Sequence, residues 1–228
     1  MSTAAPGPNA AEDARLVPLL IGLSFVTGSV DAVSILRLGH VFVANMTGNI
    51  VYLGFSLAGA TGFSVPIFLV ALGAFVLGAS FTGRHYHVCA SRRQALAQVA
   101  LAESLLVAAA CAVVLVYGTG PAHYPATALL AIAMGAQNAI AYRLAVPSLT
   151  TTVFTLTLVG LTADPPDLRH HGSLTRRRIA AMVAILAGAV AGGLLVLQAS
   201  TALALAAITV LLGLVAAFGF RADRRVTT

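Results

Sequence analysis

The sequence predicts an all-α protein, a polytopic membrane helix bundle with about six full spans and two short or re-entrant half-helices. The chain has 228 residues, of which 59% are hydrophobic and 9% are charged, and its mean hydropathy is +0.94. A soluble domain carries about 25% charged residues. Apolar runs of about 20 residues, the length that crosses a bilayer, recur along the whole chain. Most of the surface must therefore face lipid.

Eight apolar segments predict the helices. They lie at about residues 16–36, 41–60, 64–83, 96–117, 124–142, 149–162, 179–198 and 200–220. Six are long and apolar enough to span. The segments 41–60 and 149–162 differ because each begins in a Thr- or Asn-rich stretch. The second is also shorter than the roughly 17–25 residues that a span needs. These two segments are the candidate half-helices.

The basic residues of the chain are all Arg, and most of them lie in three short segments, 84–95, 163–178 and 221–228. Arg in short loops between apolar runs is typical of the cytoplasmic face of a membrane. This placement argues against nucleic acid as the reason for the net charge of +6. If all three segments are cytoplasmic, 149–162 starts and ends on that side, and 221–228 is a basic cytoplasmic tail.

The side of the N-terminus depends on the segment 41–60. If this segment crosses the bilayer fully, the N-terminus lies outside. If it enters from the outside as a half-helix and returns, the N-terminus is cytoplasmic. We expect the second arrangement, with residues 1–14 as a disordered cytoplasmic tail and residues 15–220 as a single transmembrane domain.

The two halves of the chain resemble each other. Residues 28–34 (GSVDAVS) match residues 135–141 (GAQNAIA), about 107 positions later, which pairs Asp31 with Asn138. Each stretch precedes a candidate half-helix, and each half-helix is followed by two spans. The sequence therefore predicts an internal repeat. Because each copy would hold an odd number of full spans, the second copy is inverted, as in many transporters. The two copies are residues 16–117 and 124–220.

Asp31 lies near the end of the first span, where burying an acid costs at least about 2.5–3.5 kcal/mol. It should therefore face a water cavity, find a partner or be protonated. One interpretation is an ion or proton site, or a group that binds a donor of a substrate. The other is structural, with the carboxylate tying the first helix to the amides of the half-helix, or pairing with Arg37 or Arg143.

Asn45, Thr47 and Asn49 crowd the start of the first half-helix, around Gly48. The N-terminus of a helix presents free N–H groups and a partial positive charge, which suits an anion or a carbonyl oxygen. These side chains are therefore candidate ligand contacts. The alternative is that they cap their own helix, with Asn45 or Thr47 as the N-cap.

Gln137, Asn138 and Thr151 would supply the matching lining in the second copy, with the other threonines of the run 150–152. Threonines in membrane helices can instead bond back to the preceding turn. Glu103, about two turns into its span, is a second buried acid. We expect its side chain to snorkel towards the Arg-rich loop.

Small residues repeat every four positions in two spans, at Ala74 and Gly78 and at Ala184, Gly188 and Gly192. This spacing allows helices to approach closely in lipid. The sequence holds no Ser/His/Asp set, no phosphate-binding glycine loop and no zinc-protease motif. We therefore expect no enzyme activity, no cofactor and no metal site.

Four stretches resemble the YoaK family of bacterial integral membrane proteins, which is classed as a domain of unknown function. They are residues 28–34 (GSVDAVS), 41–49 (VFVANMTGN), 135–139 (GAQNA) and 146–152 (VPSLTTT), and the resemblance extends over about residues 15–220. It implies a multi-helix inner-membrane protein. It implies no substrate.

Three functions compete. The first is a channel or secondary transporter of a small solute or a proton, with its polar site between the two half-helices. The second is a non-transporting scaffold or regulator that uses the Arg-rich loops to engage lipid or a partner. The third, an intramembrane enzyme acting on lipid, lacks a nucleophile or metal set. We expect the first, in a lipid bilayer, and the sequence leaves the oligomeric state open.

Overall fold

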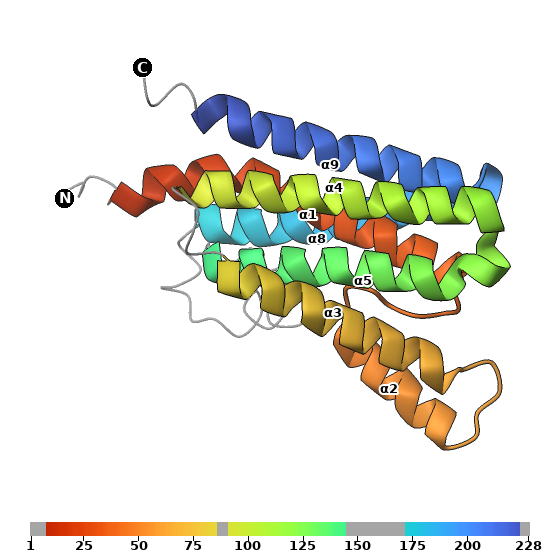
Figure 1. Ribbon diagram of the computed structural model, residues 1–228. Coiled ribbons are helices and arrows are strands. Elements are labelled where there is room, and N and C mark those ends of the chain that lie inside the picture. Colours follow the sequence, from red (N-terminus) through yellow and green to blue (C-terminus); the bar gives the residue numbers. More distant parts are fainter. Residues whose placement is uncertain (1–7, 86–90, 145–171, 224–228) are drawn as a thin grey trace.

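A computed structural model describes residues 8–85, 91–144 and 172–223, which form helices joined by short connections (Figure 1). The helices are α1 (Pro8–Arg37), α2 (Met46–Leu57), α3 (Val65–His85), α4 (Arg92–Tyr117), α5 (Thr119–Leu144), α8 (Gly172–Gln198) and α9 (Thr201–Asp223). Five of them, α1, α3, α4, α8 and α9, are long and apolar enough to cross a membrane. The prediction of a polytopic helical membrane protein is therefore confirmed.

Two helices depart from this pattern. α2 has 12 residues, so it is about 18 Å long and too short for a hydrocarbon layer of about 30 Å. α5 has 26 residues, as many as α4, but it is not among the five helices that are apolar enough to span. Its sequence includes His123, Gln137 and Asn138, polar residues that lower its hydropathy.

The helix ends follow from local capping. Ser91 accepts a hydrogen bond from the backbone N–H of Gln94 at the start of α4 (3.0 Å), and Ser200 accepts one from Leu203 at the start of α9 (3.1 Å). Each satisfies an amide that has no partner inside its helix. Gly118, with φ of 70°, ends α4. Glycine adopts a positive φ without steric cost, whereas other residues rarely do. Gly118 therefore lets the chain turn directly from α4 into α5.

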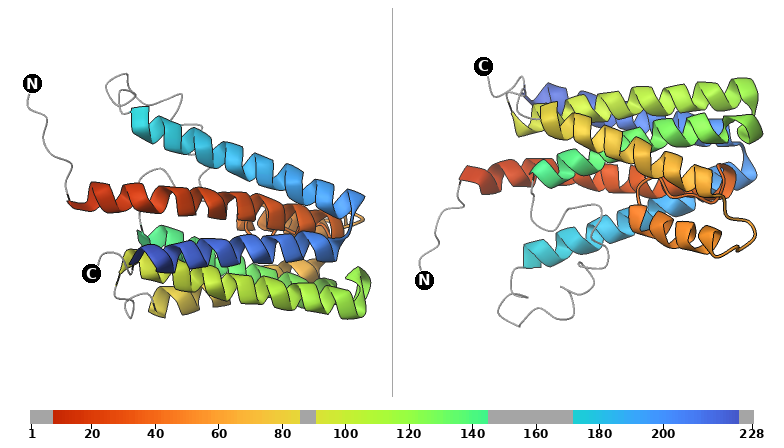
Figure 2. Two further views of the ribbon diagram at one scale, coloured as in Figure 1. Left: turned by 90° about the horizontal axis from the view of Figure 1, so that it is seen from above. Right: turned by 60° about the horizontal axis from the view of Figure 1, so that its bottom comes forward.

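The helices pack as an inner ring with two outer helices. α1, α9, α4 and α5 form the ring, in which each helix packs against its two neighbours. α8 packs on the outside against α1, and α3 packs on the outside against α5. α2 packs against α3, and Figure 2 shows it beside the end at which α3 begins. The ring encloses the hydrophobic core, whose largest buried side chains include Leu16, Leu20, Leu23, Leu96, Leu130, Met134 and Leu205.

Large apolar side chains also cover the outside of the bundle. They include Leu69, Val76, Leu77 and Phe81 of α3, Leu105 and Leu115 of α4, Val183, Leu186 and Val190 of α8, and Val210, Leu214 and Phe218 of α9. A water-soluble monomer rarely exposes contiguous apolar patches of more than a few hundred Å². A lipid environment accounts for this surface.

The crossing of α1 and α8 is close enough to exclude a β-carbon. A Cβ placed on Gly28 would lie 2.0 Å from the carbonyl oxygen of Ile185, and one placed on Gly188 would lie 2.0 Å from the carbonyl oxygen of Phe25. The Ser29 hydroxyl donates a hydrogen bond across the crossing to the carbonyl of Gly188 (2.9 Å). The small residues therefore let the two backbones touch.

α3 and α5 cross in the same manner. A Cβ on Gly78 would lie 2.0 Å from the carbonyl oxygen of Ile132, and one on Gly135 would lie 2.1 Å from the carbonyl oxygen of Phe75. The prediction that the small-residue stripes mark close helix approaches is confirmed at both crossings.

Most of the described Arg residues lie at one end of the bundle. One end, on the left in Figure 1, gathers the start of α1, α4 and α8 and the end of α3, α5 and α9. The described Arg residues at this end are Arg15, Arg84, Arg92, Arg93, Arg143, Arg176, Arg177, Arg178 and Arg221. At the opposite end, the described Arg residue is Arg37, at the end of α1.

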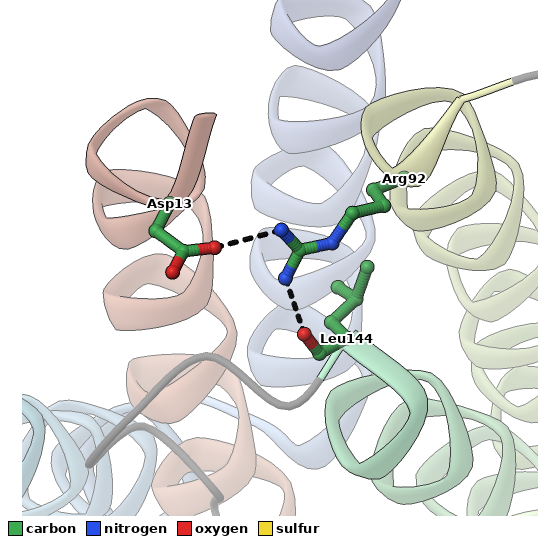
Figure 3. Close-up of polar contacts among 3 residues, drawn as sticks. All are labelled: Asp13, Arg92 and Leu144. Carbon is green, nitrogen blue, oxygen red and sulfur yellow. Dashed lines mark hydrogen bonds and ion pairs between the residues drawn. The ribbon is translucent and has the colours of Figure 1, made fainter. Parts of the chain in front are cut away.

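One of these arginines joins three helices. Arg92 of α4 forms an ion pair with Asp13 of α1 (2.7 Å) and donates a hydrogen bond to the carbonyl of Leu144 at the end of α5 (Figure 3). The structure thus continues α1 back to Pro8, into the segment 1–14 for which the sequence predicts a disordered tail. The Asp13–Arg92 pair is a tertiary contact that helix pattern alone does not reveal.

Substituting Gly28 by Ala should destabilise the bundle, because the new Cβ would collide with the backbone of α8. Overpacking of this kind costs about 1–3 kcal/mol. We expect a lower midpoint for thermal unfolding of the purified protein in detergent, followed by circular dichroism. Gly73→Ala in α3 is the matched control, because no atom lies within 4 Å of a Cβ at that position. Equal stability of the two variants would contradict the close crossing.

Candidate functional site

The connection between α1 and α2 is held by polar side chains of α1. The Ser34 hydroxyl donates a hydrogen bond to the carbonyl of Val41 (2.7 Å). Asp31 Oδ1 accepts hydrogen bonds from the backbone N–H groups of Val43 (2.9 Å) and Ala44 (3.0 Å). Non-helical backbone at membrane depth needs such partners, since lipid supplies none. Asp31 therefore ties the first helix to the amides just before α2, as the structural interpretation predicts.

Asn49 fastens the same connection from the other side. Its side chain is fully buried, its Nδ2 donates to the carbonyl of Phe42 (2.6 Å), and its Oδ1 accepts from the N–H of Phe42 (2.9 Å). Asn45 is the N-cap of α2, and its side chain accepts from the N–H of Gly48 (3.4 Å). Thr47 is exposed. The prediction that Asn45 or Thr47 caps the half-helix is confirmed for Asn45.

Asp31 keeps one oxygen outside these bonds. Among the described residues, Oδ2 of Asp31 accepts no hydrogen bond, and the side chain is partly accessible. The predicted pairing with Arg37 or Arg143 does not occur. Arg37 donates to the carbonyl of Val196 (3.5 Å), and Arg143 donates to the carbonyl of Gly83 (3.4 Å). A free carboxylate oxygen can bind a cation or a hydrogen-bond donor.

The predicted lining of the second copy lies elsewhere in the bundle. Gln137 is fully buried, and its Nε2 donates to the hydroxyl of Thr27 (2.7 Å) and the carbonyl of Leu23 (3.3 Å) on α1. Asn138 donates to the carbonyl of Met134 one turn earlier (2.8 Å). No described hydrogen bond joins either amide to Asp31. Gln137 thus bonds α5 to α1 in the ring.

The structure assembles part of the predicted site. It brings Asp31, Asn45 and Asn49 together around one connection, and it places Gln137 and Asn138 on α5. Thr151, with the run 150–152, lies outside the described residues. Thr27, the partner of Gln137, is a contact that the sequence does not predict, because a threonine in an apolar run normally bonds only to its own helix.

The prediction that Glu103 snorkels is wrong. Its side chain is fully buried, and neither carboxylate oxygen has a hydrogen-bond partner among the described residues. Glu103 lies 11 residues after Arg92, about 16 Å along the helix. It lies on the same side of α4 as the buried Ala100 and Val107. From there the side chain cannot reach the basic end of the bundle.

A groove of about 770 Å³ lies between α3 and α4, with α5 as its floor. Its lining is almost wholly apolar, and Arg84 and His85 are the charged or titratable groups in it. Of the predicted site residues, the six that the structure describes do not line it. Its apolar walls suit an acyl chain better than a polar solute.

A family model described as "Protein of unknown function (DUF1275)" matches residues 19–218. The chain is also similar to the UPF0700 transmembrane protein YoaK of Bacillus subtilis (strain 168), with 34% identity over 150 residues. The match covers 64% of this chain and 65% of that relative, just under two thirds of its length. No solved structure matches the chain. The resemblance drawn from the sequence motifs is therefore confirmed.

Replacing Asn49 by Ala should destabilise the connection to α2, because it leaves the N–H and carbonyl of Phe42 without partners. Each buried backbone group left unpaired costs about 1–3 kcal/mol. We expect a lower thermal midpoint and faster proteolysis between α1 and α2. Thr47→Ala, in the same helical turn but exposed, is the control and should behave as wild type. A stable Asn49→Ala variant would show that the Phe42 bonds are unimportant.

Proposed function

Because the chain belongs to the DUF1275 family of YoaK-like transmembrane proteins, whose function is open, we propose that it is a channel or secondary transporter of a small solute. The proposal includes an inverted internal repeat, with α5 as a sixth span and α2 as a re-entrant half-helix. The observation that carries it is a matching set of helix contacts in the two halves.

The first pair of matching contacts involves one glycine of α1 and one glycine of α5. Gly28 of α1 packs against the carbonyl of Ile185 in α8, and Gly135 of α5 packs against the carbonyl of Phe75 in α3. Gly28 and Gly135 are 107 positions apart, which is the predicted spacing of the repeat. Phe75 and Ile185 are 110 positions apart. These offsets pair α1 with α5 and α3 with α8.

The reciprocal contacts obey the same offsets. Gly188 of α8 packs against the carbonyl of Phe25, and Gly78 of α3 packs against the carbonyl of Ile132. Phe25 and Ile132 are again 107 positions apart, and Gly78 and Gly188 are again 110 apart. Two unrelated helix pairs would not be expected to cross through the same two contacts. The offsets of 107 and 110 support a repeat in which the stretch between the two crossing glycines is three residues longer in the second copy.

The order and direction of the helices support the same arrangement. In the proposed repeat, α1 corresponds to α5, α3 to α8 and α4 to α9. Under this correspondence the α1–α9 contact of one copy matches the α5–α4 contact of the other, and both contacts are present. The α4–α9 contact corresponds to itself. In Figure 1, α1 and α5 run in opposite directions along the bundle, as do α3 and α8. A repeat whose copies run in opposite directions is inverted in the membrane, and transporters of this kind bind solutes at broken helices between the copies.

In this proposal, Asp31 supplies the solute contact. Its Oδ1 holds the break between α1 and α2, and its Oδ2 accepts no hydrogen bond from the described residues. A carboxylate oxygen favours a solute with a cationic or hydrogen-bond-donating group. We place the basic end of the bundle in the cytoplasm of a bacterial cell and both chain ends on that side, in accord with the excess of Arg there.

A non-transporting scaffold is the second candidate, and a separate observation favours it. Asn45 and Asn49 are both engaged in local hydrogen bonds, so the polar motif is explained in part by the fold. Nine of the described Arg residues lie at the basic end, and the exposed ones among them, such as Arg176, could engage anionic lipid or a partner. Neither candidate function involves catalysis.

Transport can be tested in proteoliposomes with a panel of cationic and neutral solutes. We expect saturable uptake to fall at least about tenfold in Asp31→Asn, since the charge is lost while the acceptor oxygen for the connection remains. Gly73→Ala, where a Cβ meets no atom within 4 Å, is the control and should keep wild-type uptake. Asp31→Asn must also keep its thermal midpoint within a few degrees.

The same assay separates the two candidates. Wild-type uptake in Asp31→Asn would reject the assigned site. If replacing Arg176, Arg177 and Arg178 by Gln abolishes the cellular phenotype while Asp31→Asn does nothing, the scaffold is supported instead.

The orientation can be tested with single cysteines after Cys89 and Cys111 are replaced by Ser. We expect a membrane-impermeant maleimide to label Ala60→Cys and Ala199→Cys from outside intact cells. Both positions are exposed and lie at the end of the bundle away from the Arg cluster. Arg176→Cys should be labelled only after the membrane is permeabilised. The reverse pattern would invert the proposed topology.

A further inference from the structure

Glu103 is a buried acid that the proposed solute site does not use. Its exposed fraction is 0%, and its Oε1 and Oε2 both lack hydrogen-bond partners among the described residues. It lies in the interior of the inner ring, on a helix that packs against both α5 and α9. The next residue, Ser104, donates to the carbonyl of Thr209 near the middle of α9 (2.9 Å). Glu103 is therefore at mid-depth in the bundle.

The helices around Glu103 offer no cation at that depth. The titratable groups of α5 are His123 and Tyr124 near its start and Tyr142 and Arg143 near its end, and those of α9 are Arg221 and Asp223 at its end. The others on α4 are Arg92, Arg93, Cys111 and Tyr117, and those on the described part of α1 are Glu12, Asp13, Arg15, Asp31 and Arg37. Thr209 and Arg221 are 12 residues apart, about 18 Å along α9.

A metal ion does not fit the surroundings either. Magnesium and calcium take six or more oxygen ligands. The described residues contain no group of three or more His, Cys, Asp or Glu side chains that could hold a metal. The flanking buried residues of α4, Ala100 and Val107, are apolar. An ionised carboxylate in such a place would be shielded from solvent and would have no counter-ion among the described residues.

We propose that Glu103 is a proton-binding site in the membrane interior, where it holds a proton as a neutral carboxylic acid. A proton is the one cation that neutralises a carboxylate without further ligands. Release of this proton requires water or a basic group to reach the centre of the ring, which the closed packing around α4 prevents. The proton is then exchanged only when the α4–α9 or α4–α5 contact opens. This inference does not depend on the transport function or on Asp31.

The composition of the chain makes the proposal directly testable. Glu12 and Glu103 are the two glutamates of the sequence. In a Glu12→Gln variant, Glu103 is the sole glutamate, and carbon-13 labelling of glutamate then reports on Glu103 without altering it. The full-length variant is purified in lipid nanodiscs at neutral pH, and infrared spectra are recorded with and without the label.

We expect the label to shift a carbonyl band of a protonated carboxylic acid, equivalent to one group per chain. The band should be absent in Glu103→Gln, and it should persist in Asp31→Asn, which removes a different intramembrane acid. If Glu103→Gln does not fold, the labelled Glu12→Gln protein decides the question alone. A label that shifts only ionised carboxylate bands would overturn the proposal.

Discussion

The close approach of backbones at two helix crossings is the constraint on which the structure depends. Helices in lipid gain no hydrophobic free energy from meeting one another, so they associate through close packing and hydrogen bonds. Gly28 and Gly188 bring α1 and α8 into contact, and Gly78 and Gly135 do the same for α3 and α5. These two crossings attach the outer helices to the inner ring. The α3–α5 crossing also places α3, against which α2 packs.

The polar motif near the start of α2 compensates for interrupted helical structure. Where the chain leaves α1, its backbone groups lose their partners in the helix. Asp31, Ser34 and Asn49 replace those partners at Val41 to Ala44. Because the side chains that hold the break are hydrogen-bonding groups themselves, the same site can carry a structural role and a binding role. In the proposed function, Asp31 Oδ1 has the structural role and Oδ2 the binding role.

The two intramembrane acids have contrasting surroundings. Asp31 is partly accessible and receives two backbone hydrogen bonds, whereas Glu103 is enclosed and receives none from the described residues. The energetic cost of charge in a low-dielectric interior therefore acts differently on them. At Asp31 two backbone amides hydrogen-bond one carboxylate oxygen. At Glu103 only protonation removes the charge. The two proposals therefore assign different ligands to the two acids.

The sequence alone determined the membrane class, the approximate helices, the small-residue stripes and the N-cap at Asn45, because these depend on local composition and spacing. The tertiary structure decided which helices meet, and that Asn49 binds Phe42, that Gln137 binds Thr27 and that Glu103 points inward. The physical reason is that a lipid-facing helix is apolar on every side. Its periodicity does not distinguish the face that packs from the face that meets lipid, so the direction of a polar side chain follows only from the neighbours it finds.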